Sequence, residues 1–249
     1  MMKKLFIFVI ILFLLSVNIY SVNIGMSNPF IYDKIIHIGL LDSGVGYKFL
    51  KNRLEIGVGL NPLPFFLSSF GIKDFFSFTG NINFFINKSF SVYAGTHYAS
   101  YSGEDYLKDT LNEELKEVIV IKDLQLNFKA TEIYGGIQKK LSFIDIWGNL
   151  SYTSFKPEHD KEESSIRAGI GIRKNIKVIS FYRIIPYLTA SYDSLTKDFI
   201  VSLTVDNKFW DKAGLKVGLI YPGLKISVGE MVDIPVLPVF DLYIELLSF

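Results

Sequence analysis

The sequence predicts an all-β protein, a transmembrane antiparallel up-and-down β-barrel of about twelve strands, with a range of about ten to fourteen. Three observations predict this fold. Apolar and polar residues alternate with a period of two over most of the chain after residue 30. Several alternating segments last roughly 9–14 residues, which is enough for a tilted strand to cross a bilayer. Beyond the amino-terminal apolar run, no second apolar stretch has the length of a membrane helix.

The composition requires either a very large core or apolar surroundings. Hydrophobic residues make up 49% of the chain, and the sequence contains 22 Phe and 14 Tyr. The formal net charge of +1 gives no reason to expect a nucleic-acid partner. The chain has no cysteine, which excludes disulfides, thiolate metal sites and a cysteine-linked lipid anchor. We expect no metal and no cofactor.

The amino terminus has the features of a signal peptide. Lys3 and Lys4 precede an apolar run from Leu5 to Val17. We therefore expect a signal peptide over residues 1–21 and one barrel domain over residues 22–249. Ile19 fits the small-residue cleavage rule poorly, and the alternative is an uncleaved anchor. The run is shorter than the roughly 20 residues that a spanning helix needs.

The alternation gives each candidate strand one apolar face and one polar or glycine face. The candidate strands are 34–41, 45–50, 53–60, 75–87, 89–101, 124–138, 142–155, 165–173, 177–192, 197–206, 213–229 and 237–249. We place the turns at 42–44, 51–52, 87–88, 139–140, 174–175 and 193–194, where breaker residues gather. The segment 213–229 changes face at Tyr221–Pro222–Gly223, and we interpret it as one bulged strand, with a turn between two strands as the alternative. A closed barrel leaves no unpaired strand edge in lipid.

Aromatic residues near segment ends predict interfacial belts. They are Phe90, Tyr98, Trp147, Phe155, Tyr182, Tyr192, Trp210 and Tyr221. The alternative is a soluble core rich in Phe and Tyr.

Long and short connections alternate, with the long ones at 61–74, 102–123 and 156–164. Because outer-membrane barrels have short periplasmic turns, this order places both termini in the periplasm. The longest loop has a helical period, with Leu107, Leu111 and Leu115 on one side. We expect a short amphipathic helix there. It could constrict the pore or lie on the membrane surface, and packing on the barrel rim is the favoured interpretation.

The stretch from Lys51 to Gly59 and the terminal Phe249 resemble those of bacterial outer-membrane β-barrel proteins, the porin-like class. The resemblance implies the outer membrane of a diderm bacterium, with lipid as the surrounding partner. It also implies that the barrel-assembly machinery reads the last strand at Tyr243, Leu247 and Phe249. Glu245 departs from that pattern, because an apolar or aromatic residue is usual there.

The three histidines are the candidates for hydrolase or metal chemistry. His37 and His97 fall on predicted inward faces, and His159 lies in a charged loop. Ser100 points away from His97 on a regular strand, and Ser91 lies roughly 20 Å along it. A local Ser–His dyad is therefore absent, and a cross-strand partner remains open. We predict no enzyme activity.

Several of the inward-facing strand positions hold charged residues. The predicted lumen-facing charges are Glu55, Asp145, Arg167, Arg173, Arg183, Asp206, Lys216 and Lys225. They lead to two equal hypotheses, a pore with a weak anion preference and a packed, ion-paired interior without an open channel.

Together these observations predict a non-enzymatic barrel that acts as a narrow pore or as a structural or surface protein of the membrane. One alternative is a lipid-modifying barrel enzyme that uses His97. The other is a secreted periplasmic barrel that binds an apolar ligand. The sequence does not specify the substrate or the oligomeric state.

Overall fold

A computed structural model describes residues 36–39, 43–51, 53–60, 76–101, 128–157, 162–195, 197–221, 226–228, 232–234 and 236–246. The predicted signal peptide, the loop helix at 102–123 and His159 lie outside these residues. Among the described residues, no helix is long and apolar enough to cross a membrane.

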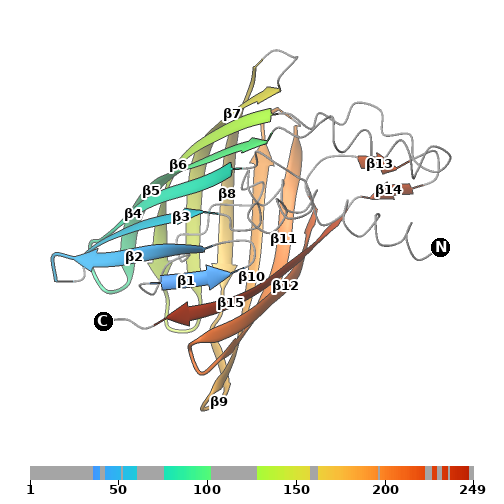
Figure 1. Cartoon of the computed structure of the whole chain (residues 1–249). Helices are drawn as coiled ribbons and strands as arrows, with labels where there is room; N and C mark the ends of the chain where they lie inside the picture. The colour runs from blue at the N-terminus through green and yellow to red at the C-terminus, as the bar shows by residue number, and fades with distance from the viewer. Residues whose placement is uncertain are drawn as a thin grey trace.

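The described chain forms a closed antiparallel barrel (Figure 1). Its strands are β1 (Ile36–Gly39), β2 (Ser43–Phe49), β3 (Leu54–Leu60), β4 (Phe76–Phe85), β5 (Phe90–Tyr101), β6 (Phe128–Lys140), β7 (Asp145–Pro157), β8 (Glu163–Arg173), β9 (Ile176–Ile179), β10 (Tyr182–Asp193), β11 (Asp198–Phe209), β12 (Ala213–Tyr221) and β15 (Leu237–Leu246). Most strands pair with the next strand in the chain; β8 pairs with β10 instead of β9, and β15 pairs with both β12 and β1 to close the ring. The predicted fold class is confirmed.

The thirteen strands of this sheet make a twelve-membered ring, because β8 and β9 lie end to end along the same edge of β10. The interruption between β8 and β9 lies opposite Pro186. The Lys174 N–H donates to the Pro186 carbonyl at 3.2 Å, but proline has no N–H to return. The predicted turn at Lys174–Asn175 is therefore wrong, and the chain reverses at Ser180–Phe181 instead.

Residues on the outward face are apolar. They include Leu150 at 59% exposure and Ile133 at 61%. The inward face is mainly polar and is buried. Its buried polar members are Glu55, Ser77, Asn83, Ser91, His97, Glu132, Gln138, Ser151, Thr153, Ser165, Thr189, Ser191, Asp193, Ser202, Thr204, Asp206 and Asp241. A polar interior does not suit the alternative of a barrel that holds an apolar ligand.

Glycines on the inward face make room for aromatic rings from the next strand. Tyr93 pairs with Gly136 in the β5–β6 register, and a Cβ at Gly136 would come within 2.6 Å of the Tyr93 ring. Tyr134 lies in the same way over Gly95, Trp147 over Gly171 and Tyr243 over Gly214. These rings fill the space beside the strands that a narrow barrel leaves inside.

The orientation of Trp147 corrects one expectation. Trp147 was expected in an interfacial belt, but its parity places it inward, where it is 1% exposed. Trp210 does lie on the outside at a turn, stacked on Phe181 with ring centroids 5.3 Å apart. Trp147 shares its parity on β7 with the buried Ser151 and Thr153, so the face it occupies follows from its position along the strand.

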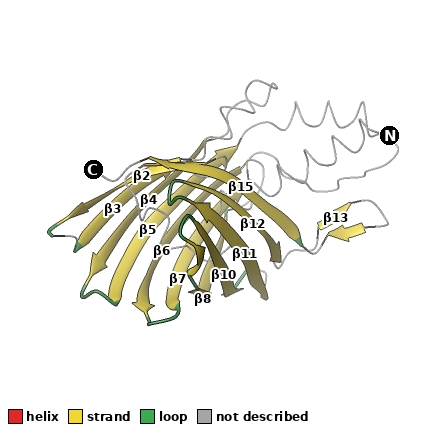
Figure 2. Ribbon diagram, turned by 90° about the horizontal axis from the view of Figure 1, so that it is seen from below, coloured by secondary structure: helices red, strands yellow, loops and turns green. Residues whose placement is uncertain are grey.

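The two ends of the barrel differ in their connections. One end carries the tight turns β2–β3, β4–β5, β6–β7, β9–β10 and β11–β12, which Figure 2 shows in green. Leu50 and Lys51 in the first of these turns have φ of 49° and 55°, and Trp210 and Asp211 in the last have 49° and 54°. β1 begins and β15 ends at this same end, which we call the short-turn end; the opposite end is the long-loop end.

The predicted strand over 213–229 is wrong in its second half. β12 ends at Tyr221, and β13 (Ile226–Val228) pairs with β14 (Val232–Ile234) in a separate two-stranded sheet. The change of face at Tyr221–Pro222–Gly223 therefore marks the end of a strand.

Candidate functional site

The barrel interior is the candidate functional site, and ion pairs cross much of its wall. Arg173 Nε lies 2.9 Å from Asp145 Oδ2, on neighbouring strands β8 and β7. Arg167 forms an ion pair with Asp193 between β8 and β10. Much of the wall charge is therefore neutralised in place.

The other predicted lumen charges also lie on the inward side where the structure describes them. Arg183 pairs with Asp211 at 3.0 Å near the short-turn end, and both side chains are partly exposed. Glu55 is buried on β3, and Lys216 lies opposite Asp206 and Asp241 in the register. Lys225 lies outside the described residues.

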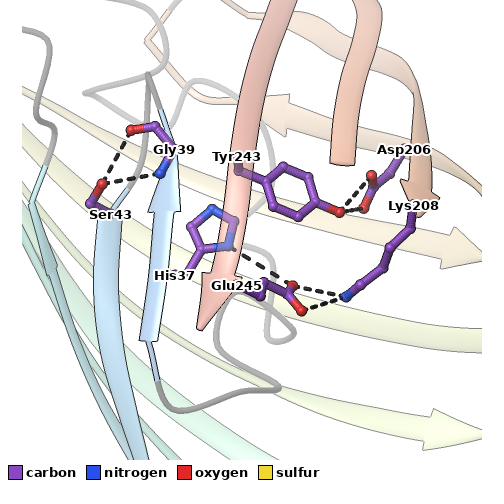
Figure 3. Close-up of polar contacts among 7 residues, drawn as sticks. All are labelled: His37, Gly39, Ser43, Asp206, Lys208, Tyr243 and Glu245. Carbon is purple, nitrogen blue, oxygen red and sulfur yellow. Dashed lines mark hydrogen bonds and ion pairs between the residues drawn. The ribbon is translucent and has the colours of Figure 1, made fainter. Parts of the chain in front are cut away.

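The seam between the first and last strands has its own polar contacts (Figure 3). Glu245 on β15 accepts from Lys208 Nζ at 2.8 Å, and its carboxylate lies 3.9 Å from His37 Nδ1 on β1. The Ser43 hydroxyl accepts from the Gly39 N–H and donates to the Gly39 carbonyl, both at 3.1 Å. These contacts join β1, β2, β11 and β15 where the ring closes.

The contact with Lys208 explains why Glu245 departs from the apolar pattern expected of the last strand. Its side chain faces the interior and is 11% exposed, so its task is to pair with Lys208 rather than to meet lipid. Tyr243 also faces inward, and Leu247 and Phe249 lie outside the described residues. The role of Tyr243, Leu247 and Phe249 as an assembly signal stays a prediction.

A second cluster runs across five strands on the other wall. The register aligns Thr79, His97, Glu132, Thr153 and Ser165 in one continuous row from β4 to β8. We call this set the polar row. Cross-strand neighbours of this kind have Cβ atoms roughly 4.5–5.5 Å apart.

Four consecutive members of the polar row have a buried atom without a hydrogen-bond partner. These atoms are His97 Nδ1, Glu132 Oε2, Thr153 Oγ1 and Ser165 Oγ. Each of the four residues is at most 4% exposed. Buried polar groups are rarely left unpaired, so a row of them indicates a place that water or a polar solute occupies.

The polar inside, the apolar outside and the closed ring together decide the class of this protein. It is a closed antiparallel β-barrel with the arrangement of a transmembrane barrel, a polar inside and an apolar outside. No protein-family model matches the sequence, and no curated protein matches it.

Several solved outer-membrane proteins are similar to this barrel in structure. The anion-selective porin from Comamonas acidovorans is 8% identical, with a TM-score of 0.39, and the match covers 82% of this chain and 57% of the porin. A bacterial polysaccharide outer-membrane secretin is 13% identical, with a TM-score of 0.44, covering 82% of this chain and 69% of the secretin. OmpT of Vibrio cholerae, in its trimer form, is 11% identical, with a TM-score of 0.39, covering 82% of this chain and 62% of OmpT. The barrel thus spans less than two thirds of the length of the porin and of OmpT.

One contact in the barrel bears on enzyme chemistry. Ser77 Oγ on β4 lies 2.9 Å from His97 Nε2 on β5, and both residues are buried. Glu132 is the direct cross-strand partner of His97 on β6, although His97 Nδ1 and Glu132 Oε2 both lack a partner. The arrangement brings a hydroxyl to an imidazole, without an acid to orient the ring.

Sequence reasoning missed Ser77 and four inward acids. The acids are Glu132, Asp193, Asp241 and Glu245. Parity gave a usable signal for Glu132, because it shares a face with the aromatic Tyr134 and with Gly136. The negative charges of these acids offset the positive charges of the basic residues on the inward face. The basic residues therefore no longer argue for an anion preference.

No group of three or more His, Cys, Asp or Glu residues within the described ranges is arranged to hold a metal ion. His37 contacts Glu245 and the Tyr243 ring, with ring centroids 4.7 Å apart, and so serves the seam.

Proposed function

We propose that this protein is a narrow pore for small polar solutes or ions in the outer membrane of a diderm bacterium. The observation that carries this proposal is the set of unpartnered polar atoms on the buried inward wall from β4 to β10. Besides the four in the polar row, they are Asn83 Oδ1, Gln138 Nε2 and Ser191 Oγ.

Each such atom costs about 1–3 kcal/mol if it stays dry and unpaired. Water inside the barrel removes that cost, because a bridging water can satisfy two to four polar groups. A wetted wall along six adjacent strands is what a narrow aqueous path requires. A ring of twelve strands lies between small, filled barrels and wide porins in diameter.

The arrangement of the ends supports an orientation. Short turns and both ends of the barrel ring share one side, which in outer-membrane barrels is the periplasmic side. The proposal includes export by the predicted signal peptide and insertion by the barrel-assembly machinery through the last strand.

The test is single-channel recording with the purified full-length barrel in a planar lipid bilayer. We expect discrete conductance steps, smaller than those of sixteen-stranded porins. The matched control is a sample of the same protein held unfolded in urea, identified by the absence of a heat-modifiable gel shift. A folded, membrane-inserted barrel without conductance steps would contradict the pore and leave a structural or surface role.

A second candidate function rests on the contact between Ser77 and His97. It is hydrolysis of a lipid ester, with Ser77 as the nucleophile and His97 as the base. Loss of ester hydrolysis in both Ser77→Ala and His97→Ala, with the gel shift retained, would support it. Ser91→Ala is the matched control, because Ser91 is an equally buried inward serine on β5 that contacts Gln138 instead. Equal hydrolysis by all four proteins would remove this candidate.

A further inference from the structure

The polar row lies near the long-loop end of the barrel. His97 precedes the end of β5 by four residues, and Glu132 follows the start of β6 by four. A solute that enters from that end reaches the row before it reaches the interior rings of Tyr93 and Trp147.

The opposite wall does not offer such a site, because its polar groups satisfy one another. Asp206 on β11 accepts from the Tyr243 hydroxyl on β15, and Lys208 on β11 pairs with Glu245 on β15. The unpartnered buried atoms are therefore concentrated on the β4–β10 side of the interior.

Charge determines which solute fits the polar row. Glu132 is a carboxylate at 2% exposure whose Oε2 has no partner. Arg167, the basic residue that acts on Glu132, already pairs with Asp193. Ser151 hydrogen-bonds to the Glu132 side chain, so the open position is at Oε2. A cation bound at that oxygen lowers the cost of burying the charge.

The atoms that the polar row offers as ligands indicate which kind of cation it would bind. Glu132, Thr153 and Ser165 supply oxygens, which hard cations prefer. A single carboxylate provides little charge for a divalent ion, because calcium sites combine six to eight oxygens and often several carboxylates. The hydroxyl and imidazole groups beside Glu132 add neutral hydrogen-bond donors and acceptors.

We infer that the polar row, through its members His97, Glu132, Thr153 and Ser165, binds a small monovalent cation in the lumen and gives the barrel a preference for cations. The selectivity part of this inference rests on the proposed pore function. The binding part does not, because a closed barrel can hold the same ion.

The first experiment measures reversal potentials across a planar bilayer under a KCl gradient, for wild type, Glu132→Gln and Asp206→Asn. We expect a cation preference in wild type and a loss of about threefold or more in the potassium-to-chloride permeability ratio for Glu132→Gln. Asp206→Asn is the matched control, since it removes an equally buried inward charge on the self-paired wall and keeps an acceptor for Tyr243. An anion preference, or equal shifts in the two variants, would overturn the inference and leave the pore intact.

The second experiment needs no conductance. Sodium-23 NMR line broadening is measured on the detergent-folded barrel, with potassium chloride added as the competitor. We expect broadening that potassium reverses, and its loss in Glu132→Gln. Thr153→Val removes one ligand oxygen and no charge, and we expect it to weaken the broadening. It is the variant to compare with wild type if Glu132→Gln does not fold. Broadening without conductance would remove the pore and keep the cation site, whereas no difference between the wild type and the folded variants would remove the site.

Discussion

The Tyr243 hydroxyl oxygen on β15 lies 2.7 and 2.8 Å from the two carboxylate oxygens of Asp206 on β11, with β12 between them. The residue that the ring crosses on β12 is Gly214, and a Cβ there would collide with the ring. The absence of one side chain thus lets a hydrogen bond span three strands near the closing seam.

Removing that hydroxyl should weaken the barrel. In Tyr243→Phe, the buried Asp206 carboxylate loses its hydrogen-bond donor, so we expect a loss of about 1–3 kcal/mol in the free energy of unfolding. Urea titration of the refolded barrel, followed by the gel shift, measures it. Tyr152→Phe, on the outward face at 48% exposure, is the control and should change little. Equal stabilities for the two variants would contradict a role for the Tyr243–Asp206 contact.

Gly135 and Gly136 are adjacent in the chain, but only Gly136 lies under an aromatic ring. Substituting each in turn therefore tests whether the ring needs a glycine beneath it. Gly136→Ala would push a methyl group into the Tyr93 ring and the Gly148 carbonyl. We expect it to destabilise the barrel by about 1–3 kcal/mol, as overpacking does. Gly135→Ala is the control, since its Cβ would lie 3.6 Å from the Tyr93 carbonyl, an ordinary contact. The same urea titration compares them, and a larger loss in Gly135→Ala would refute the packing argument.

Replacing only one residue of the Arg167–Asp193 ion pair should lower the free energy of unfolding. Asp193 is 2% exposed, and removing only its partner leaves a buried charge. We expect Arg167→Gln or Asp193→Asn to lose about 3–5 kcal/mol each, and the double variant to lose clearly less than the sum. A double-mutant cycle on unfolding free energies gives the coupling. Strictly additive losses would show that the two side chains do not act as a pair.

The outward face should tolerate charge only away from the middle of the membrane. Leu150 lies near the centre of β7 on the outward face, so Leu150→Arg should cost about 2–4 kcal/mol in a lipid bilayer. Phe143→Arg, in the β6–β7 turn at 65% exposure, should cost about 0–1 kcal/mol. Folding into liposomes, measured by the gel shift, separates the two. Equal folding yields would mean that Leu150 does not meet lipid.

Several elements were predictable because their signals are local. Alternation over 76–86 and 165–173 identified β4 and β8 and assigned their faces, since each side chain's side follows from its position along the strand. The strand count near twelve was also predictable and is confirmed, because turns and alternation repeat along the chain. The turn at Lys174–Asn175 was wrong because breaker residues were weighed without Pro186, which lies opposite them on another strand.

The candidate site needed information that alternation does not contain. His97 was identified as inward, but its contact with Ser77 follows from a β4–β5 register in which Thr79 opposes His97 and Ser77 opposes Ala99. A register shifted by one residue would have turned Ser77 to lipid. The predicted turn at Asn87–Lys88 was not placed accurately enough to fix that register.

By itself, the sequence determined that this chain forms long strands, which side of each strand is apolar, and that the apolar sides need a solvent other than water. Only the tertiary structure decided which residues become neighbours: Tyr243 and Asp206, Arg167 and Asp193, and the residues of the polar row on adjacent strands. The physical reason is that the facing of a side chain is a property of one strand. Register and closure are properties of pairs of strands, and they depend on every turn and interruption between them.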